Sequence, residues 1–278
     1  MAFGHSTETI IIAALSTLPS PHLSRLTHSI SAVHHRHLHR LAALLSSPTI
    51  FSLSLRHLQS LSLHNKSLLI ATHLLSNLNL LKSHFSSAQL PPCSAAIPMK
   101  LRDLDAALLL LLLCEIHHHD REFLNTPPSR WQSILARYVS DSILRLSSFG
   151  GGCSNGEIMI QFIESVRRCW NLVNVMGFCE GNKEGGEEAA SPAAVVALPS
   201  VQVPGGEEGE CVICKEMMKG REVCEFPCGH LFHWLCILRW LKKRNTCPCC
   251  RRRVPTDDVR REIERLLEDF TRIGGGGL

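Results

Sequence analysis

Six cysteines and two histidines gather near the carboxy-terminal end of this chain in closely spaced pairs. Their order is Cys211-x2-Cys214, thirteen residues, Cys228-x-His230-x2-His233-x2-Cys236, ten residues, then Cys247-x2-Cys250. Thiolate and imidazole groups are the ligands that zinc takes in structural sites, four to each tetrahedral ion. Eight such residues therefore predict two complete zinc sites. Cys224 and Cys249 fall off this spacing and are interpreted as small, partly buried thiols.

The order of the ligands distinguishes among the known zinc folds. A zinc finger of the Cys2His2 type ends with two histidines, whereas this motif ends with Cys247 and Cys250. A PHD finger has a single histidine after four cysteines and an aromatic residue two before the seventh ligand, where this chain has Asn245. Histidines in both the fourth and the fifth ligand positions resemble the RING-H2 family, and the resemblance covers about residues 209–254.

The RING-H2 resemblance implies a metal arrangement and an activity. It implies cross-braced binding of two zinc ions, the first held by Cys211, Cys214, His233 and Cys236 and the second by Cys228, His230, Cys247 and Cys250. It also implies an E3 ubiquitin ligase, which holds a ubiquitin-charged E2 enzyme so that the thioester meets a substrate lysine. Such catalysis works by positioning, so we expect His230 and His233 to bind metal and not to transfer protons.

Four further residues stand where the family contacts its E2 enzyme. By the resemblance, Ile213 corresponds to the aliphatic residue of the first zinc loop and Trp240 to the aromatic residue of a short helix at 234–241. Pro248 corresponds to the proline of the second zinc loop, and the three would form a shallow apolar groove. Arg251 corresponds to the basic residue that bridges E2 and ubiquitin. The alternatives are that Ile213 and Trp240 are core residues and that Arg251 is merely solvated.

Two other functions compete with that of an E3 ligase. A non-enzymatic adaptor, which uses the zinc domain only as an interaction module, is the main alternative to a ligase. Nucleic-acid binding is a weaker candidate, because the formal net charge is only +4 and the basic residues form no continuous surface in the sequence. We therefore expect a protein substrate and no nucleic acid.

The region before the zinc motif is rich in leucine, and only 5% of the chain is aromatic, which favours helices over sheets. Apolar residues recur at helical intervals along 20–45, and further helices are expected at 48–63, 66–81, 100–118, 131–146 and 157–176. The stretch 51–55 alternates in polarity, so a strand is an alternative there, although its surroundings favour helix. The expected fold class is mainly α: a leucine-rich helical domain, a flexible linker, a small ββα RING-H2 cross-brace and a carboxy-terminal helix.

Changes in composition predict the domain boundaries. We expect a helical domain for targeting or substrate choice at 1–177, a flexible linker at 178–208, the RING-H2 zinc domain at 209–254, and a carboxy-terminal helix and tail at 255–278. Within the linker, the apolar segment 193–203 is expected to pack on the domain that follows it. The last helix is expected over 256–273, with Gly274 ending it.

Histidines cluster at two places in the helical region, 34–39 and 117–119. His35 and His39 share a helical face, but no carboxylate or cysteine lies beside them in sequence. A solvated, weakly basic face is therefore expected instead of a metal site. The second cluster stands at the end of an expected helix, where imidazolium favours the dipole.

Cysteine usage predicts a reducing compartment. The first apolar stretch, 10–15, has no basic leader and no cleavage site, and Cys-x2-Cys pairs without an export signal indicate metal ligands. The longest apolar run, 106–114, has nine residues. A membrane span needs about 20, so this run is expected to be a buried core helix.

Residues 1–100 contain seven Lys or Arg against a single acid, Glu8. With its many serines, this composition is similar to an organelle transit sequence. Ubiquitin and E2 enzymes work in the cytosol, which argues against import. Two alternatives stay open: the region docks on an anionic organelle surface, or it is a basic helical domain without either role.

The whole chain is also similar to a plant member of the RING-H2 family. This resemblance is carried by the segments 13–18, 22–30, 99–106, 195–199, 224–228, 245–248 and 255–259, and it is weakest at 125–187. It implies an E3 ligase of the plastid, associated with the amyloplast at its cytosolic surface, with a cytoplasmic location as the alternative. It also implies regulation of the organelle's detachment from actin filaments during gravity sensing, that is, in gravitropism.

Overall fold

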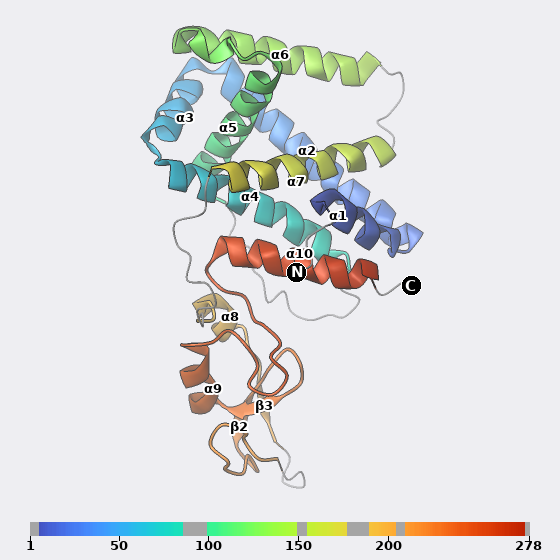
Figure 1. Cartoon of the computed structure of the whole chain (residues 1–278), viewed down its shortest axis with the longest axis vertical. Coiled ribbons are helices and arrows are strands. Elements are labelled where there is room, and N and C mark those ends of the chain that lie inside the picture. Colours follow the sequence, from blue (N-terminus) through green and yellow to red (C-terminus); the bar gives the residue numbers. More distant parts are fainter. Residues whose placement is uncertain (1–5, 86–98, 149–154, 177–188, 204–208, 276–278) are drawn as a thin grey trace. The chain divides into compact units, whose positions relative to one another are not determined.

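The computed structural model describes residues 6–85, 99–148, 155–176, 189–203 and 209–275, without the side chains of 142–148 and 155. Over these residues the chain is mainly α, as expected, with ten α-helices and one three-stranded sheet (Figure 1). It divides into two compact units. The helical unit comprises the described residues up to 176 together with 263–275, and the second unit comprises those from 189 to 262.

The helical unit is arranged around its longest helix, α2, which contacts α3, α5, α6 and α7, while α4 packs against α7. Its elements are α1 (Thr7–Ser16), α2 (Ser20–Ser46), α3 (Pro48–Ser60), α4 (Leu63–Ser83), α5 (Leu101–His119), the 3-10 turn η1 (Phe123–Asn125), α6 (Pro128–Ser148) and α7 (Asn155–Val175). The stretch 51–55 lies in α3 and is helical. This helix begins at Pro48 because Ser47 caps it, its hydroxyl accepting from the backbone N–H of Ile50 at 3.4 Å.

The leucine run of α5 is buried in the core of the helical unit. Leu109 and Leu112 join an apolar cluster with residues of α2, α3 and α6, among them Leu44, Phe51, Leu58 and Leu135. The prediction of a core helix at 106–114 is therefore confirmed. None of the described helices is long and apolar enough to cross a membrane.

A bidentate ion pair ties α2 to α5 through that core. The Arg40 guanidinium donates to both carboxylate oxygens of Asp105, at 2.5 and 2.6 Å, and Asp105 is only 4% exposed. Hydrogen bonding to Asp105 raises the pKa of Arg40, so the guanidinium is charged. Because Arg40 is paired with Asp105, it is not available to bind an external anion, and residues 1–100 contain only seven Lys or Arg.

The carboxy-terminal helix α10 (Val259–Gly275) belongs to the helical unit from Ile263 onward. One face of it is buried, through Ile263, Leu266, Leu267 and Phe270. The Phe270 ring meets that of Phe85 edge-on with centroids 5.7 Å apart, and Lys82 of α4 pairs with Asp269. The helix expected as a separate tail is thus a core element of the domain at the other end of the chain.

The prediction that Gly274 ends this helix is wrong. The helix continues to Gly275, and Gly274 stands where α10 approaches α1. A Cβ atom at Gly274 would lie 2.9 Å from the Cβ of Ala13 and 3.0 Å from its carbonyl carbon. Glycine is required there because the two backbones are too close for a side chain.

The second unit contains the sheet, whose strands β1 (Ser200–Gln202), β2 (Glu222–Glu225) and β3 (Leu231–His233) pair antiparallel in the order β1-β2-β3. The helix α9 (Trp234–Leu241) follows β3 directly and packs on β2 and β3. Val223, Phe232, Ile237 and Leu241 form much of the buried core. Strands β2 and β3 with α9 make the ββα arrangement expected of the zinc domain.

The segment before the zinc motif, 190–203, is also part of this unit, and we name it the bracing segment. It contains α8 (Pro192–Val196) and β1. Its first two N–H groups donate to the carbonyls of Leu241 at 2.8 Å and Pro255 at 2.9 Å, and its other end adds β1 to the sheet. Ala190, Ala194, Leu198 and Val203 are buried in the core of the unit. As expected, the apolar segment 193–203 packs on the domain that follows it, although it lies within the range predicted as a linker.

We predict that the bracing segment stabilises the zinc domain. Leu198 is 5% exposed, so Leu198→Ala is expected to cost about 2–5 kcal/mol of unfolding free energy, as large-to-small core substitutions do. Val196, in the same segment, is 84% exposed, so Val196→Ala serves as a control and should change little. Release of zinc to a chelating dye across a urea series measures the effect. Coincident release curves for Leu198→Ala and the unsubstituted protein would contradict it.

Candidate metal centre

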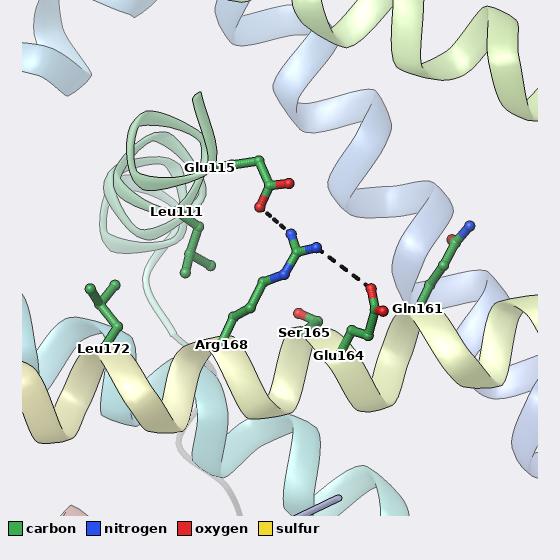
Figure 2. A pocket seen from close by; sticks show the side chains of 7 residues that line it. All are labelled: Leu111, Glu115, Gln161, Glu164, Ser165, Arg168 and Leu172. Carbon is green, nitrogen blue, oxygen red and sulfur yellow. Dashed lines mark hydrogen bonds and ion pairs between the residues drawn. The ribbon is translucent and has the colours of Figure 1, made fainter. Parts of the chain in front are cut away.

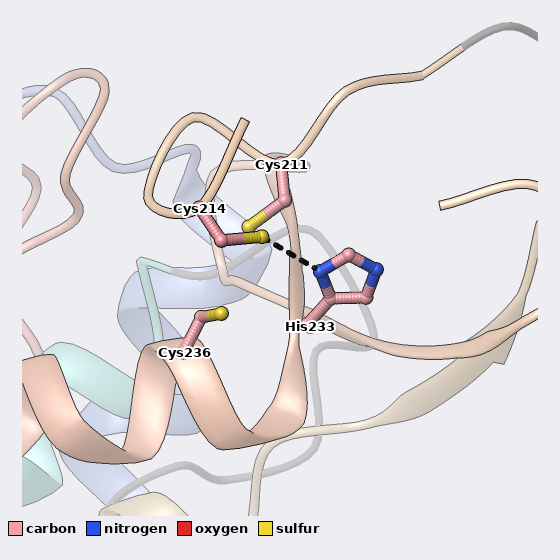
Figure 3. A group of neighbouring side chains, drawn as sticks. All are labelled: Cys211, Cys214, His233 and Cys236. Atoms are coloured by element: carbon pink, nitrogen blue, oxygen red, sulfur yellow. Dashed lines mark hydrogen bonds between the residues drawn. The ribbon is translucent and has the colours of Figure 1, made fainter. Parts of the chain in front are cut away.

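The first group of metal-binding side chains joins the loop before β2 to the start of α9. Cys211 and Cys214 come from the loop, His233 ends β3, and Cys236 lies in the first turn of α9. Figure 3 shows the three thiols and the imidazole directed toward a common centre. Their ligand atoms all lie within 4.8 Å of one another, and the Cys214 Sγ is 3.3 Å from the His233 Nδ1.

The second group joins the β2–β3 turn to the loop after α9. Cys228 and His230 come from the turn, and Cys247 and Cys250 from the loop. The His230 Nδ1 is 3.1 Å from the Cys228 Sγ and 3.8 Å from the Cys247 Sγ. Each group thus draws on two segments far apart in sequence. His230 directly precedes β3 and His233 is its last residue, so the groups interleave as the RING-H2 resemblance implies.

Both groups fit a zinc ion. Each offers three thiolates and one imidazole, a donor set of structural zinc sites. With zinc–sulfur bonds of about 2.3 Å and zinc–nitrogen bonds of about 2.1 Å, tetrahedral geometry places sulfur and nitrogen ligands about 3.6 Å apart. The three sulfur–nitrogen separations, 3.1, 3.3 and 3.8 Å, bracket that value. The chain therefore has two metal sites suited to two zinc ions.

Each Cys-x2-Cys pair closes in the same backbone turn. Lys215, after the first pair, and Arg251, after the second, have φ of 64° and 59° and are the two non-glycine residues with positive φ in the described part of the chain. Their N–H groups donate to the carbonyls of Cys211 at 2.7 Å and Cys247 at 3.0 Å. This left-handed conformation costs roughly 1–2 kcal/mol for a residue with a side chain, so the metal site must hold it. The sequence pattern did not predict this left-handed conformation, although a basic residue follows each Cys-x2-Cys pair.

The three apolar residues expected at an E2 contact are all half-buried. Ile213 lies in the first zinc loop and Pro248 in the second. Trp240, near the end of α9, donates its indole N–H to the carbonyl of Thr246 at 2.7 Å, while the Arg244 guanidinium stands 4.9 Å from its ring centroid. Trp240 therefore ties α9 to the residue just before the second zinc loop. The sequence analysis predicts an E2 contact at Trp240 but neither of these two partners within the chain.

The two cysteines outside the ligand spacing differ from each other. Cys224 is completely buried in β2, and burial, with the nearby Glu225 carboxylate, raises its pKa to about 12. It is an inert core thiol. Cys249 is exposed, not partly buried as expected, because it stands at the tip of the second zinc loop. Neither belongs to a metal-binding group.

The histidine clusters of the helical unit form no metal site. Among the described residues, the two groups above are the ones close enough to share an ion. His35 bonds the carbonyl of Ser31 in its own helix, at 2.8 Å. His37 packs against His73 of α4 with ring centroids 5.3 Å apart, and burial, with the nearby His37, lowers the pKa of His73 to about 4. His73 is thus a neutral core residue near neutral pH.

A pocket of about 220 Å³ lies between α5 and α7 in the helical unit (Figure 2). Arg168 of α7 crosses it and pairs with Glu115 of α5 and, at 3.5 Å, with Glu164 of its own helix. Leu111 and Leu172 supply apolar lining. Since Arg168 is paired with both Glu115 and Glu164, the pocket offers no unpaired cation to an incoming anion. The Arg168–Glu115 pair instead links α7 to α5.

Comparison with known proteins agrees with the geometry of the metal centre. Residues 209–251 match the sequence profile of the Ring finger domain. With its two interleaved Cys3His groups, the chain is a RING-type zinc protein. Over 271 residues it is 49% identical to "E3 ubiquitin-protein ligase SGR9, amyloplastic" of Arabidopsis thaliana, and 94% of each chain is covered. The chain belongs to this family of RING-type E3 ubiquitin-protein ligases.

Shorter matches have the same family name. The chain is 47% identical over 77 residues to E3 ubiquitin-protein ligase MPSR1 of Arabidopsis thaliana, which covers 27% of this chain and 37% of that one. It is 44% identical over 85 residues to the E3 ubiquitin-protein ligase RNF181 homolog of Drosophila melanogaster. That match covers 29% of this chain and 58% of the Drosophila protein. With these relatives the similarity is confined to less than a third of this chain.

Proposed function

We propose that this protein holds a ubiquitin-charged E2 enzyme on its RING domain and presents the thioester to a lysine of a protein substrate. The observation that carries the proposal is the pair of interleaved Cys3His groups, because metal in both would hold the two zinc loops in one rigid arrangement. Bound zinc has a structural role here. The rate gain comes from restricting the conjugate to a reactive geometry.

In this proposal Ile213, Trp240 and Pro248 receive the E2 enzyme. Half-burial suits that role, because such residues are anchored in the unit yet keep apolar surface for a partner. The hydrogen bond from Trp240 to Thr246 supports it further, since it holds the aromatic ring beside the loop that presents Pro248. Apolar contact at these positions supplies affinity, and the metal sites supply the fixed spacing.

Arg251 is proposed to bridge E2 and ubiquitin. Its side chain is exposed, and the described residues provide no carboxylate partner for it. Its backbone is held by the zinc-loop turn, so the side chain projects from a rigid base. A guanidinium with several free donors can bond two carbonyl groups of different proteins at once.

We predict that Arg251→Ala slows discharge of ubiquitin from a charged E2 by about 10- to 100-fold, the equivalent of a charged hydrogen bond of about 1.5–3 kcal/mol. Lys215→Ala is a matched control, because Lys215 has the same left-handed backbone in the other zinc loop. Both substitutions carry the same backbone cost, so a structural effect would appear in both. Single-turnover discharge to free lysine measures the rate. Equal rates for the two variants would refute the bridging role, and no consumption of ubiquitin with any E2 enzyme would favour the adaptor.

We further propose that the protein acts at plastids of the amyloplast type, since the Arabidopsis relative that spans nearly the whole chain is named amyloplastic. The cytosolic face is the proposed location, because ubiquitin and E2 enzymes are found in the cytosol. There the ligase would regulate the interaction of amyloplasts with actin filaments in gravitropism. The helical unit is proposed to choose location or substrate.

A further inference from the structure

Three helix ends meet at one place on the helical unit, where α3 ends and α4 and α5 begin. The His57 imidazole near the end of α3 accepts from the Arg102 guanidinium at 2.7 Å and lies 3.1 Å from the Asp103 carboxylate, both in the first turn of α5. Only Leu61 and Ser62 separate α3 from α4. The three ends are therefore close together within one compact unit (Figure 1).

Basic side chains outnumber acidic ones at these ends. Arg56, Lys66, Lys100 and Arg102 stand here, and none of the four has a carboxylate partner among the described residues. The carboxylate of Asp103 is bonded to His57. A further cation near the start of α5 is neutralised, since Arg40 pairs with Asp105. Internal pairing thus leaves an excess of positive charge at this end.

Apolar side chains accompany that charge. Leu63 and Leu101 are the first residues of α4 and α5, and they are 61% and 56% exposed. Lys66 lies one turn after Leu63, and Lys100 directly precedes Leu101. Long basic side chains beside exposed leucines can bind phosphate groups while the leucines enter the acyl boundary of a bilayer. We call Arg56, Leu63, Lys66, Lys100, Leu101 and Arg102 the helix-end surface.

We propose that the helix-end surface docks the protein on an anionic lipid bilayer. Charge complementarity selects an anionic partner, and the exposed leucines select a bilayer over a partner that offers only charge. Each basic residue close to an anionic leaflet contributes about a fivefold gain in affinity. The binding would be peripheral. The inference concerns attachment and does not depend on ubiquitin transfer.

Sedimentation of the full-length protein with vesicles tests this surface. Phosphatidylcholine vesicles containing phosphatidylglycerol should bind the protein, and added salt should weaken the binding. Lys66→Gln with Lys100→Gln is expected to weaken it about 30-fold. Arg25→Gln with Arg36→Gln is the matched control, because it removes the same charge from exposed positions on α2 and should bind nearly as well as the unsubstituted protein.

A second variant separates lipid insertion from simple attraction between charges. Leu63→Ser with Leu101→Ser keeps every charge and should also weaken binding several-fold, since burial of each leucine is lost. Far-ultraviolet circular dichroism verifies that each variant is folded. Equal binding to vesicles of pure phosphatidylcholine, no binding to anionic vesicles, or an equal loss in the two charge variants would overturn the proposal.

Ubiquitin transfer in solution, measured on the same proteins, keeps this inference apart from the proposed ligase activity. Unchanged transfer by the Lys66→Gln, Lys100→Gln variant, together with lost sedimentation, supports a docking surface distinct from the RING. An unsubstituted protein that sediments but transfers no ubiquitin would refute the ligase proposal and leave the surface supported. An unsubstituted protein that transfers ubiquitin but never sediments with vesicles would refute the docking surface and leave the ligase proposal supported.

Discussion

Replacing Cys228 with serine is expected to remove one zinc ion from each chain and to abolish ubiquitin transfer. The Cys228 thiol lies 3.1 Å from the His230 imidazole in a group completed by Cys247 and Cys250. Structural zinc in small domains contributes about 10–16 kcal/mol of apparent binding free energy at neutral pH, more than a typical domain has to spare. Serine supplies no thiolate, so the second zinc loop, with Pro248 and Arg251, would lose its fixed position.

The metal content of the purified variant and its single-turnover discharge rate measure this effect. Cys249→Ser is a close control, since the same chemical change is made at an exposed thiol next to the ligand Cys250. It should retain two zinc ions and nearly full activity. Two zinc ions in Cys228→Ser, or one in Cys249→Ser, would contradict the assignment of Cys228 as a ligand and of Cys249 as a bystander.

Phe270→Ala should destabilise the helical unit by about 3–5 kcal/mol, although it lies beyond the RING in sequence. The Phe270 side chain is 1% exposed and meets Phe85 in the core of that unit. The alanine would leave a cavity between α10 and the end of α4. Since domains of this size have about 5–15 kcal/mol of stability, a loss of this order removes much of it.

Urea unfolding followed by far-ultraviolet circular dichroism measures this loss, because most of the described helix lies in that unit. Thr271→Ala, at an exposed position on the same helix, is expected to stay within about 0.5 kcal/mol of the unsubstituted protein. Zinc content should be unchanged in both variants, since α10 provides no ligand. A Phe270→Ala midpoint equal to that of Thr271→Ala would mean that α10 is not part of the helical core.

The metal-binding residues were predictable because the chemistry is local. Cysteine and histidine in short pairs, such as Cys211 with Cys214, can direct two side chains to one ion whatever surrounds them. The helices were predictable for a similar reason, since leucine-rich periodicity specifies one apolar face. Alternation at 51–55 did not produce a strand, because a cap at Ser47 and a buried face through Phe51 and Leu58 stabilise the helix instead.

Features that depend on distant contacts were harder to predict. Nothing near Gly274 in sequence reveals that Ala13 lies against it, so the sequence alone predicts a helix end at this glycine. The positive φ of Lys215 and Arg251 likewise follows from closure of the metal site and not from residue type, because neither residue favours that conformation. The bracing segment lies within a range whose composition resembles a linker. It forms regular structure because its strand β1 pairs with β2.

Ligand spacing and apolar periodicity act over a few residues, so they are enough to predict a two-zinc RING domain and a mainly helical remainder. Which surfaces remain for partners depends instead on contacts between residues far apart in sequence. Ion pairs such as Arg40 with Asp105 remove some cations and leave others, among them Lys66 and Lys100, without a carboxylate partner in the described part of the chain. The position of α10 in the amino-terminal unit also depends on distant contacts, since its apolar face is buried against residues far away in sequence, such as Phe85 against Phe270.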